Sequence, residues 1–322
     1  MTKIAILDAF TTDSGRNKLA GNPAAVVLST EPLDEQARRN IAIELNQPAI
    51  AFVSHPALET PSSFVSAVSA PLPLIRWHTF TGASLPLCGH ATMAASSYLL
   101  DYFAPSLPQI RYEFFLPSID AQGTKTETSH ELVAERTDDG RIEIALPASM
   151  APQQVPDEHK ESIFRALKAA SGIAQSDVVE LSSSPSNNSW EHNLTVTLSP
   201  EVDLGALKVD SPAFLTIPYR GIYLTNRYPT PSPYHFRSRT FFPSVGILED
   251  QVCGSAHTRL GPMWIEQLEA AGTPLPPVVE VDQVSPRGGQ FALRWDGKWG
   301  EDGGLVSLRG KAKLIMEGEL RI

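Results

Sequence analysis

Short apolar runs separated by glycine and proline recur along the first part of the chain, and they predict a sheet with few helices. Runs at 1–8, 24–28, 49–53 and 74–77 have the length of buried strands. Between them, alanine and leucine recur at helical spacing over 33–45, which predicts a helix. The segment 89–100 also predicts a helix, but its small residues are apolar nearly all round. Such a helix is normally enclosed by other elements rather than laid on a surface.

The remainder of the chain repeats this alternation of strands and occasional helices. Strands are predicted at 110–115, 131–135, 141–146, 178–181, 194–198, 221–225, 290–295, 305–309 and 312–316, and helices at 157–170 and 254–268. The segment 55–73, rich in Ser, Pro and Ala, is predicted to be a surface loop or insertion. We therefore expect an α+β protein with domains at 1–125 and 126–322, the last strands being free to return to the first domain.

Composition narrows the functional class. The chain has 322 residues, with 26 Lys and Arg against 36 Asp and Glu, and a net charge of −10. Without a cluster of basic residues, this charge argues against a nucleic-acid partner. A membrane partner is not expected either, because no apolar run is long enough to span a bilayer. Asp8 comes too soon for a secretory segment, and the two cysteines fit a reducing compartment, so a cytoplasmic protein is expected. Nothing indicates a metal or a cofactor.

The two cysteines lie in matching contexts, about half a chain apart. One context is Leu87-Cys88-Gly89-His90-Ala91-Thr92, and the other is Val252-Cys253-Gly254-Ser255-Ala256-His257. In each, an apolar residue precedes Cys-Gly and a predicted helix begins. This pattern indicates an internal duplication with one copy in each domain.

The start of a helix suits a reactive cysteine. Unpaired backbone N–H groups and the positive end of the helix dipole stabilise a thiolate, whose pKa can fall from about 8.5 to about 3.5–7.5. The following glycine lets a substrate approach the backbone, and the N–H groups can hold a carboxylate. Two such cysteines facing one substrate could remove a proton from carbon on one side and return it on the other.

Several segments resemble, in order, the PhzF-like family of phenazine-biosynthesis proteins. They are Ala20–Val27, Ile75–Trp77, Cys88–Thr92, Ser238–Pro243, Glu249–His257, Leu308–Gly310 and Glu317–Leu320. The resemblance covers nearly the whole chain. It implies a diaminopimelate-epimerase-like fold, with two similar domains that each wrap a sheet around a central helix. It also implies proton transfer without a cofactor, in a cleft between the domains, in proteins that often form homodimers.

Two departures from the family pattern bear on the chemistry. Ala49 stands where PhzF-like isomerases usually carry a glutamate base, and alanine cannot accept a proton. Cys253 stands where they typically have threonine, so it resembles the second catalytic cysteine of diaminopimelate epimerase and proline racemase. Cys88-Gly89-His90 resembles the first cysteine motif of proline racemase. We interpret the chain as a PhzF-like scaffold adapted to epimerase chemistry with two bases.

This interpretation gives each motif residue an expected role. Cys88 and Cys253 would be the paired acid and base of a cofactor-independent epimerase, racemase or related isomerase. The substrate would be a small carboxylate or carbonyl compound with an acidic C–H. The further catalytic residues expected are His90 and Asp250, and the residues expected to bind substrate are Asn22, Gly89, Gly254 and Ser255.

Other interpretations of the same residues stay open. The cysteines could be small buried apolar residues, His90 and Asp250 could serve the helix ends, and Asn22 could form a turn with its proline. His257 is expected to be structural. A second hypothesis keeps the fold but assigns a double-bond or keto–enol isomerisation to His90 and Asp250, with elimination as a variant. A third hypothesis is a binding protein without catalysis on this scaffold.

Overall fold

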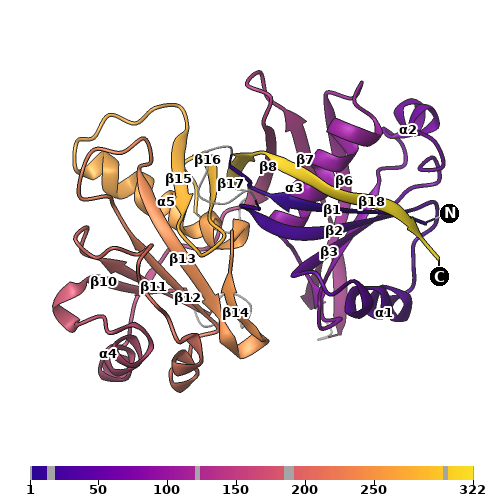
Figure 1. Ribbon diagram of the computed structural model, residues 1–322. Coiled ribbons are helices and arrows are strands. Elements are labelled where there is room, and N and C mark those ends of the chain that lie inside the picture. Colours follow the sequence, from indigo (N-terminus) through magenta and orange to yellow (C-terminus); the bar gives the residue numbers. More distant parts are fainter. Residues whose placement is uncertain (1, 13–18, 120–123, 185–191, 300–303, 322) are drawn as a thin grey trace. The chain divides into compact units, whose positions relative to one another are not determined.

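The computed structural model divides the chain into two compact units (Figure 1). It describes residues 2–12, 19–119, 124–184, 192–299 and 304–321. Unit 1 takes in Met1–Ser14, Lys18–Leu146 and Ser307–Ile322, and unit 2 consists mainly of Pro147–Val306. This division differs from the expected boundary between 125 and 126. The reason is that the strands after residue 109 form antiparallel hairpins within the sheet of unit 1 and keep the chain there.

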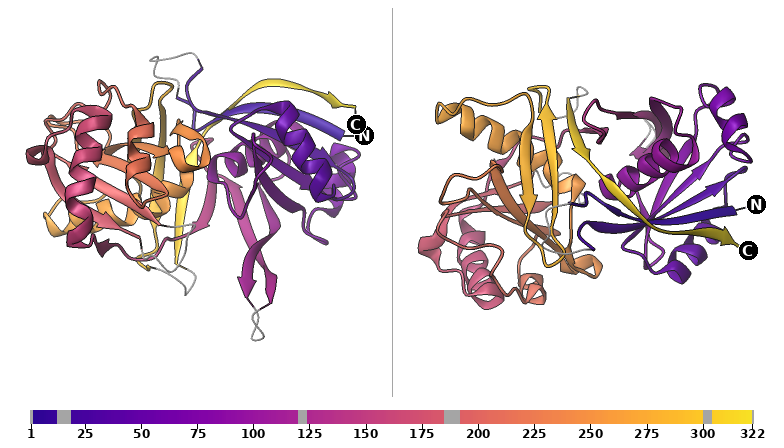
Figure 2. Two further views of the ribbon diagram at one scale, coloured as in Figure 1. Left: turned by 90° about the horizontal axis from the view of Figure 1, so that it is seen from below. Right: turned by 45° about the horizontal axis from the view of Figure 1, so that its top comes forward.

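The sheet of unit 1 contains both described ends of the chain. Its strands follow the order β18 (Ala312–Leu320), β1 (Thr2–Ala9), β2 (Asn22–Ser29), β3 (Ala49–Ser54), β4 (Leu74–Thr79), β6 (Gln109–Ile119), β7 (Lys125–Arg136) and β8 (Ile142–Pro147). Pairs β2–β3 and β4–β6 are parallel and the others antiparallel, and β5 (Ser84–Leu85) pairs with β4. Thr2 lies opposite Leu320, and the long β6–β7 hairpin extends away from the rest of the unit (Figure 2).

Helix α3 (Gly89–Ser97) is the central helix of unit 1. All nine of its residues are buried, and it contacts β1, β2 and β3. Helix α1 (Glu35–Leu45) covers the other face of the sheet, where Ile41 packs with Val27 and Phe52 in one apolar core. Strands β2 and β3 are therefore buried on both faces, which explains why their sequences are continuous apolar runs. A π-helical segment, Tyr98–Phe103, continues α3.

The segment 55–73 is not only a loop, so that expectation is wrong in part. It contains helix α2 (Pro61–Ala67), which begins with a capping box formed by Thr60 and Ser63. Phe64 of this helix is fully buried, and its ring lies 5.9 Å from that of Phe103. The segment therefore contributes a side chain to the core of unit 1.

Unit 2 repeats the plan of unit 1. Its strands follow the order β9 (Gln153–Gln154), β10 (Val178–Ser183), β11 (Asn193–Leu198), β12 (Gly221–Asn226), β13 (Phe236–Phe242), β15 (Val279–Gln283) and β16 (Gly289–Trp295), with β14 (Ile247–Asp250) also paired to β13. Its helices are α4 (Asp157–Ser171), α5 (Gly254–Ala270) and the short 3₁₀ segments Gln175–Asp177, Ser211–Thr216 and Pro243–Val245. Strand β17 (Leu305–Gly310) returns the chain to unit 1.

The strand pairings show how closely the two units match. Strands β1, β2, β3 and β4 pair in antiparallel, parallel and antiparallel fashion, and β10, β11, β12 and β13 do the same. A parallel partner then follows in each unit, β6 beside β4 and β15 beside β13. Helix α3 follows the short strand β5, as α5 follows β14. The two Cys-Gly turns therefore occupy equivalent places in a duplicated topology.

Helices also cover both faces of the sheet of unit 2. On one face, Ile163 and Leu167 of α4 join a core with Val196 and Leu224. On the other face, the α5 residue Trp264 donates from Nε1 to Thr225 Oγ1 at 2.8 Å and stacks on Phe236. The part of α5 from Ala256 to Trp264 is thus buried as α3 is, whereas the end of the helix is exposed.

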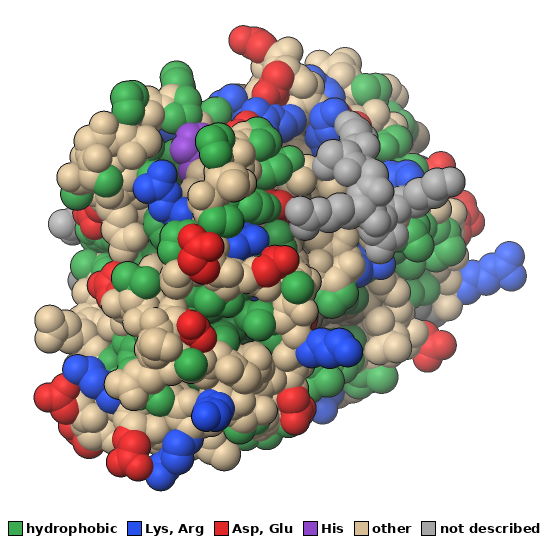
Figure 3. All heavy atoms as spheres, turned by 60° about the vertical axis from the view of Figure 1, so that its left-hand side comes forward, with side chains coloured by type: hydrophobic (Ala, Val, Ile, Leu, Met, Phe, Trp, Pro, Cys, Tyr) green, Lys and Arg blue, Asp and Glu red, His purple; other side chains and the backbone are tan. Residues whose placement is uncertain are grey.

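Acidic and basic side chains are interspersed over the face drawn in Figure 3. Among the described residues, no helix has the length and apolar character needed to cross a membrane.

Candidate active site

Cys88 is the residue that begins the central helix of unit 1. It is the N-cap of α3, in an extended conformation with φ −142° and ψ 105°, and it is 6% exposed. Its carbonyl accepts hydrogen bonds from the Thr92 backbone N–H at 2.9 Å and from Thr92 Oγ1 at 2.8 Å. These bonds hold the Cys88 peptide at the helix start, where the N–H groups of the first turn concentrate positive potential.

His90 is the predicted site residue that lies against Cys88. Its Nδ1 is 3.5 Å from Cys88 Sγ, and both side chains are buried. A neutral imidazole can accept the thiol proton at Nδ1, and an imidazolium can donate to the thiolate. The pair can therefore exchange a proton.

Asn22 and Ala49 begin the two parallel strands that pack on α3. Asn22 is the first residue of β2 and is 1% exposed. Ala49 is the first residue of β3, is equally buried, and pairs with Ala24 and Thr79. A methyl group thus occupies the position at which the family resemblance implies a glutamate base.

Cys253 repeats the arrangement of Cys88 in unit 2. It is the N-cap of α5, with φ −103° and ψ 97°, and is 2% exposed. Its Sγ lies 3.4 Å from Ser255 Oγ, and its carbonyl accepts from His257 Nδ1 at 2.7 Å. In both units the side chain two positions after the cysteine contacts the sulfur. In both, the side chain four positions after it donates to the cysteine carbonyl.

The electrostatics of Cys253 differ from the expectation for a helix start. Burial raises the pKa of the Cys253 thiol well above its ordinary value, and the negative charge of Asp250 and a hydrogen bond with it add to the rise. Hydrogen bonds from Ser255 and from the Ala256 backbone N–H lower the pKa of Cys253, but by less than burial and Asp250 raise it. The expected lowering is therefore wrong for Cys253, which is a neutral thiol at pH 7 because burial and a carboxylate both disfavour the thiolate.

His257 has a structural role, as predicted. It is fully buried and must carry its proton on Nδ1, because the Cys253 carbonyl can only accept. Its Nε2 then accepts from Ser238 Oγ at 3.0 Å. Burial lowers the pKa of His257 to about 4, so the ring is neutral.

This neutral ring predicts a pH-dependent stability. Unfolded His257 binds a proton at its ordinary pKa of 6.5, whereas the folded ring does so only near 4. The free energy of unfolding should therefore fall as the pH drops from 6.5 towards 4, by about 3 kcal/mol from this group. The His257→Asn variant keeps a donor for the Cys253 carbonyl and should show a shallower fall in urea titrations across this range. Equal slopes in the two proteins would contradict the assignment.

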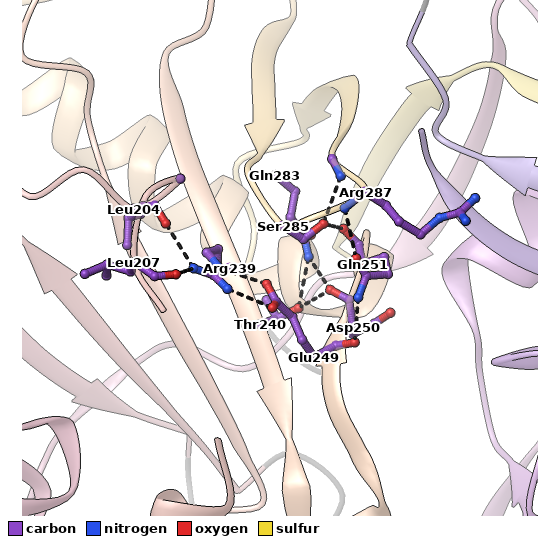
Figure 4. Close-up of polar contacts among 12 residues, drawn as sticks. Leu204, Leu207, Arg239, Thr240, Glu249, Asp250, Gln251, Gln283, Ser285 and Arg287 are labelled. Carbon is purple, nitrogen blue, oxygen red and sulfur yellow. Dashed lines mark hydrogen bonds and ion pairs between the residues drawn. The ribbon is translucent and has the colours of Figure 1, made fainter. Parts of the chain in front are cut away.

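The segment before Cys253 is held by two buried side chains from neighbouring strands (Figure 4). Arg239 of β13 makes a bidentate ion pair with Glu249, at 2.7 and 2.8 Å, and also donates to two carbonyls, those of Leu204 and Leu207. Gln283 of β15 accepts from the Cys253 N–H at 2.8 Å and donates to the Asp250 carbonyl at 2.6 Å. These contacts fix the course of the chain from Glu249 to Cys253.

Two other residues at this place were missed by sequence reasoning. Gln283 ends a strand that carries no recognisable motif, so no local signal identified it. Arg220 precedes β12, and its guanidinium lies 5.9 Å from the centre of the Phe242 ring. Burial lowers the pKa of Arg220, while negative charge on Tyr223 and Cys253 would raise it. This interaction with Cys253 places Arg220 near the turn, although burial has the larger effect on the Arg220 pKa.

The structure assembles the predicted site residues in two groups, each within its own unit. Cys88, Gly89 and His90 form the start of α3 in unit 1, where Asn22 begins β2. Asp250, Cys253, Gly254 and Ser255 form the turn from β14 into α5 in unit 2. Within the described ranges, no three His, Cys, Asp or Glu side chains are grouped so as to hold a metal ion.

Comparison with known sequences identifies the family of the chain. A family model described as phenazine biosynthesis-like protein matches residues 7–318. The mouse phenazine biosynthesis-like domain-containing protein 2 is 35% identical over 329 residues, covering 98% of each chain. A Pseudomonas aeruginosa protein named an uncharacterized isomerase is 29% identical, covering 98% of this chain and 97% of its own.

Comparison with solved structures addresses the fold. A PhzF family protein from Enterococcus faecalis superposes with a TM-score of 0.71 at 26% identity, covering 100% of this chain and 99% of that one. A hydroxyproline epimerase from Agrobacterium vitis has a TM-score of 0.51 at 11% identity, covering 99% and 90% of the two chains, and shares the fold alone. The expected α+β, diaminopimelate-epimerase-like fold is confirmed. The chain therefore belongs to the PhzF-like family of phenazine biosynthesis-like proteins, some of which are named isomerases.

Proposed function

We propose that this protein is a cofactor-independent epimerase or racemase that uses Cys88 and Cys253 as its acid and base. Its substrate is a small molecule with a C–H next to a carboxylate or another carbonyl group. The observation that carries the proposal is the repetition of one arrangement in both units. A cysteine begins the central helix, a glycine follows, and a polar side chain contacts the sulfur from the second position after it.

The local environments favour different starting states for the two sulfurs. Cys253, buried beside Asp250, begins as a thiol and can donate a proton. Cys88 has the His90 imidazole at 3.5 Å, which can take up its proton and leave a thiolate as the base. The two cysteines exchange the roles of acid and base when the reaction runs in the opposite direction. Each stereoisomer of the substrate therefore reacts with one protonation state of the cysteine pair.

The proton balance of one turnover is simple. The thiolate of one cysteine takes the proton from carbon and becomes a thiol, and the bond electrons pass into the adjacent carboxylate or carbonyl. The thiol of the other cysteine then protonates the carbon from the opposite side and becomes a thiolate. Backbone N–H groups at the two helix starts, at Gly89, His90, Gly254 and Ser255, are suited to stabilise the negative charge that develops.

Hydrogen–deuterium exchange tests this proposal directly. The protein is incubated in D₂O with a panel of small carboxylic acids, each offered as a single stereoisomer with a C–H next to the carboxylate. We expect one class of substrate to gain deuterium at that carbon and to lose optical purity, followed by NMR and polarimetry. Deuterium uptake should vanish in the Cys88→Ser/Cys253→Ser double variant. Uptake that persists in the double variant would remove the two-thiol mechanism.

A second candidate function is a double-bond or keto–enol isomerisation by His90 and Asp250. The observation that favours it is that Asp250 lies close enough to the Cys253 sulfur to perturb its pKa, so the carboxylate is placed at the same turn. In this mechanism the cysteines only line the site. Deuterium would enter the product without loss of configuration at a saturated centre. Activity would also survive the substitution of Cys253.

A further inference from the structure

We infer that Gln283 is a positioning residue that holds Asp250 and Cys253 in register with each other. The inference rests on the proposed function, which assigns both residues to the reactive turn, and it adds a residue outside every motif of the sequence. Gln283 is the last residue of β15 and is fully buried. It lies 30 residues after Cys253 in the chain and reaches the turn only through the sheet.

The side-chain amide of Gln283 forms hydrogen bonds through both its oxygen and its nitrogen. Oε1 accepts from the Cys253 N–H at 2.8 Å, while Nε2 donates to the Asp250 carbonyl at 2.6 Å and to Thr240 Oγ1 at 3.1 Å. A backbone N–H can only donate and a carbonyl can only accept, so the orientation of the amide is determined. The single planar group thus joins the peptide of Asp250 to that of Cys253.

Further hydrogen bonds join the strands β13 and β15 to the same turn. Thr240 Oγ1 also donates to the Asp250 carbonyl, at 3.2 Å. Beyond Gln283, Ser285 Oγ donates to the Gln251 carbonyl at 2.6 Å (Figure 4). The segment that ends β15 therefore runs along the reactive turn and bonds to it at successive peptides. Since the turn carries the Cys253 sulfur, loss of the amide should free that sulfur to move.

The chemical requirement for an amide can be tested by two substitutions. Gln283→Leu keeps the approximate volume but has neither donor nor acceptor. Gln283→Glu keeps an acceptor for the Cys253 N–H, and supplies a donor to the Asp250 carbonyl only when its carboxyl is protonated. Gln36→Glu makes the same change on the exposed face of α1 in unit 1, where Asn40 can turn its side-chain amide to donate to the new carboxylate, and serves as the control.

The measurement is the rate of iodoacetamide alkylation at each cysteine of the folded protein, resolved by peptide mass spectrometry. In Gln283→Leu, the rate at Cys253 should rise about tenfold or more, because local opening no longer breaks buried hydrogen bonds. The rate at Cys88, which lies in unit 1, should stay within about twofold and reports on global unfolding. Gln36→Glu should leave both rates unchanged.

The pH dependence separates positioning from simple packing. In Gln283→Glu, the excess rate at Cys253 over wild type should be large at alkaline pH and shrink as acid protonates the new carboxyl. In Gln283→Leu the excess should not depend on pH. The titratable and charged groups on the surrounding elements are Asp250, Cys253, Arg220, Arg239, Glu249 and His257. All six are present in both variants, so their effects cancel in this comparison.

Each outcome has a clear meaning. A Cys253 rate within twofold of wild type in Gln283→Leu, or an equal rise at both cysteines, would overturn the inference. If Gln283→Leu does not fold, a pH-independent excess in Gln283→Glu would overturn it as well. Alkylation that responds as expected in a protein that exchanges no deuterium would instead disprove the proposed function and leave the positioning role intact.

Discussion

The Cys253→Ser variant should fold normally and lose about 10²–10⁴-fold in the rate at which a single stereoisomer loses its optical purity, which is the usual contribution of one acid–base group. Serine keeps the size of the side chain and its contact with Ser255, which lies 3.4 Å from the sulfur. Its hydroxyl, however, cannot reach the ionised state that the return half of the reaction requires. The backbone contacts of the turn do not involve the sulfur, so they should persist.

The matched variant for this experiment is Cys253→Thr. Threonine is the residue that the family resemblance places at this position, so a site built on His90 and Asp250 should tolerate it. We therefore expect Cys253→Thr to be as inactive as Cys253→Ser, with thermal unfolding close to wild type. Epimerisation that persists in Cys253→Thr would contradict the two-thiol mechanism, and a shifted double bond or carbonyl group formed by this variant would favour the isomerisation by His90 and Asp250.

The parts of the fold that sequence reasoning predicted are those in which local pattern and tertiary burial agree. Helix α3 was expected over 89–100 as an enclosed helix of small residues, and it is buried on every side. The Cys-Gly turns were expected to match because each cysteine precedes a helix start, and the strand pairings repeat around them. These features depend on neighbours within a few residues, so one sequence is enough to expose them.

The parts that sequence reasoning missed depend on residues brought together by the sheet. Gln283 contacts Cys253 through β15, and nothing near Gln283 in the chain indicates this. The direction of the Cys253 pKa was also mispredicted, because the helix start is a local feature whereas complete burial and the nearby Asp250 charge are tertiary ones. Phe64 shows the same limit, since a segment of Ser, Pro and Ala gave no sign of a core side chain.

The Arg239→Met variant should be the most destabilising single change at the reactive turn, at about 3–5 kcal/mol. Arg239 is 5% exposed and Glu249 13%, so removal of the guanidinium leaves a mostly buried carboxylate without its ion-pair partner. The carbonyls of Leu204 and Leu207 lose a donor as well. The loss should appear as a lower midpoint in urea unfolding followed by tryptophan fluorescence.

A double-mutant cycle separates the charge effect from the loss of contacts. Arg239→Met combined with Glu249→Leu removes the buried carboxylate too, and should recover more than half of the stability lost in the single variant. Arg165→Met is the control, because Arg165 and Glu161 form an exposed pair, 72% and 83% accessible, on α4. Exposed pairs on a helix contribute only about 0.3–0.5 kcal/mol. If Arg239→Met cost no more than Arg165→Met, the ion pair would not be what anchors the turn, and Gln283 would hold it without help from β13.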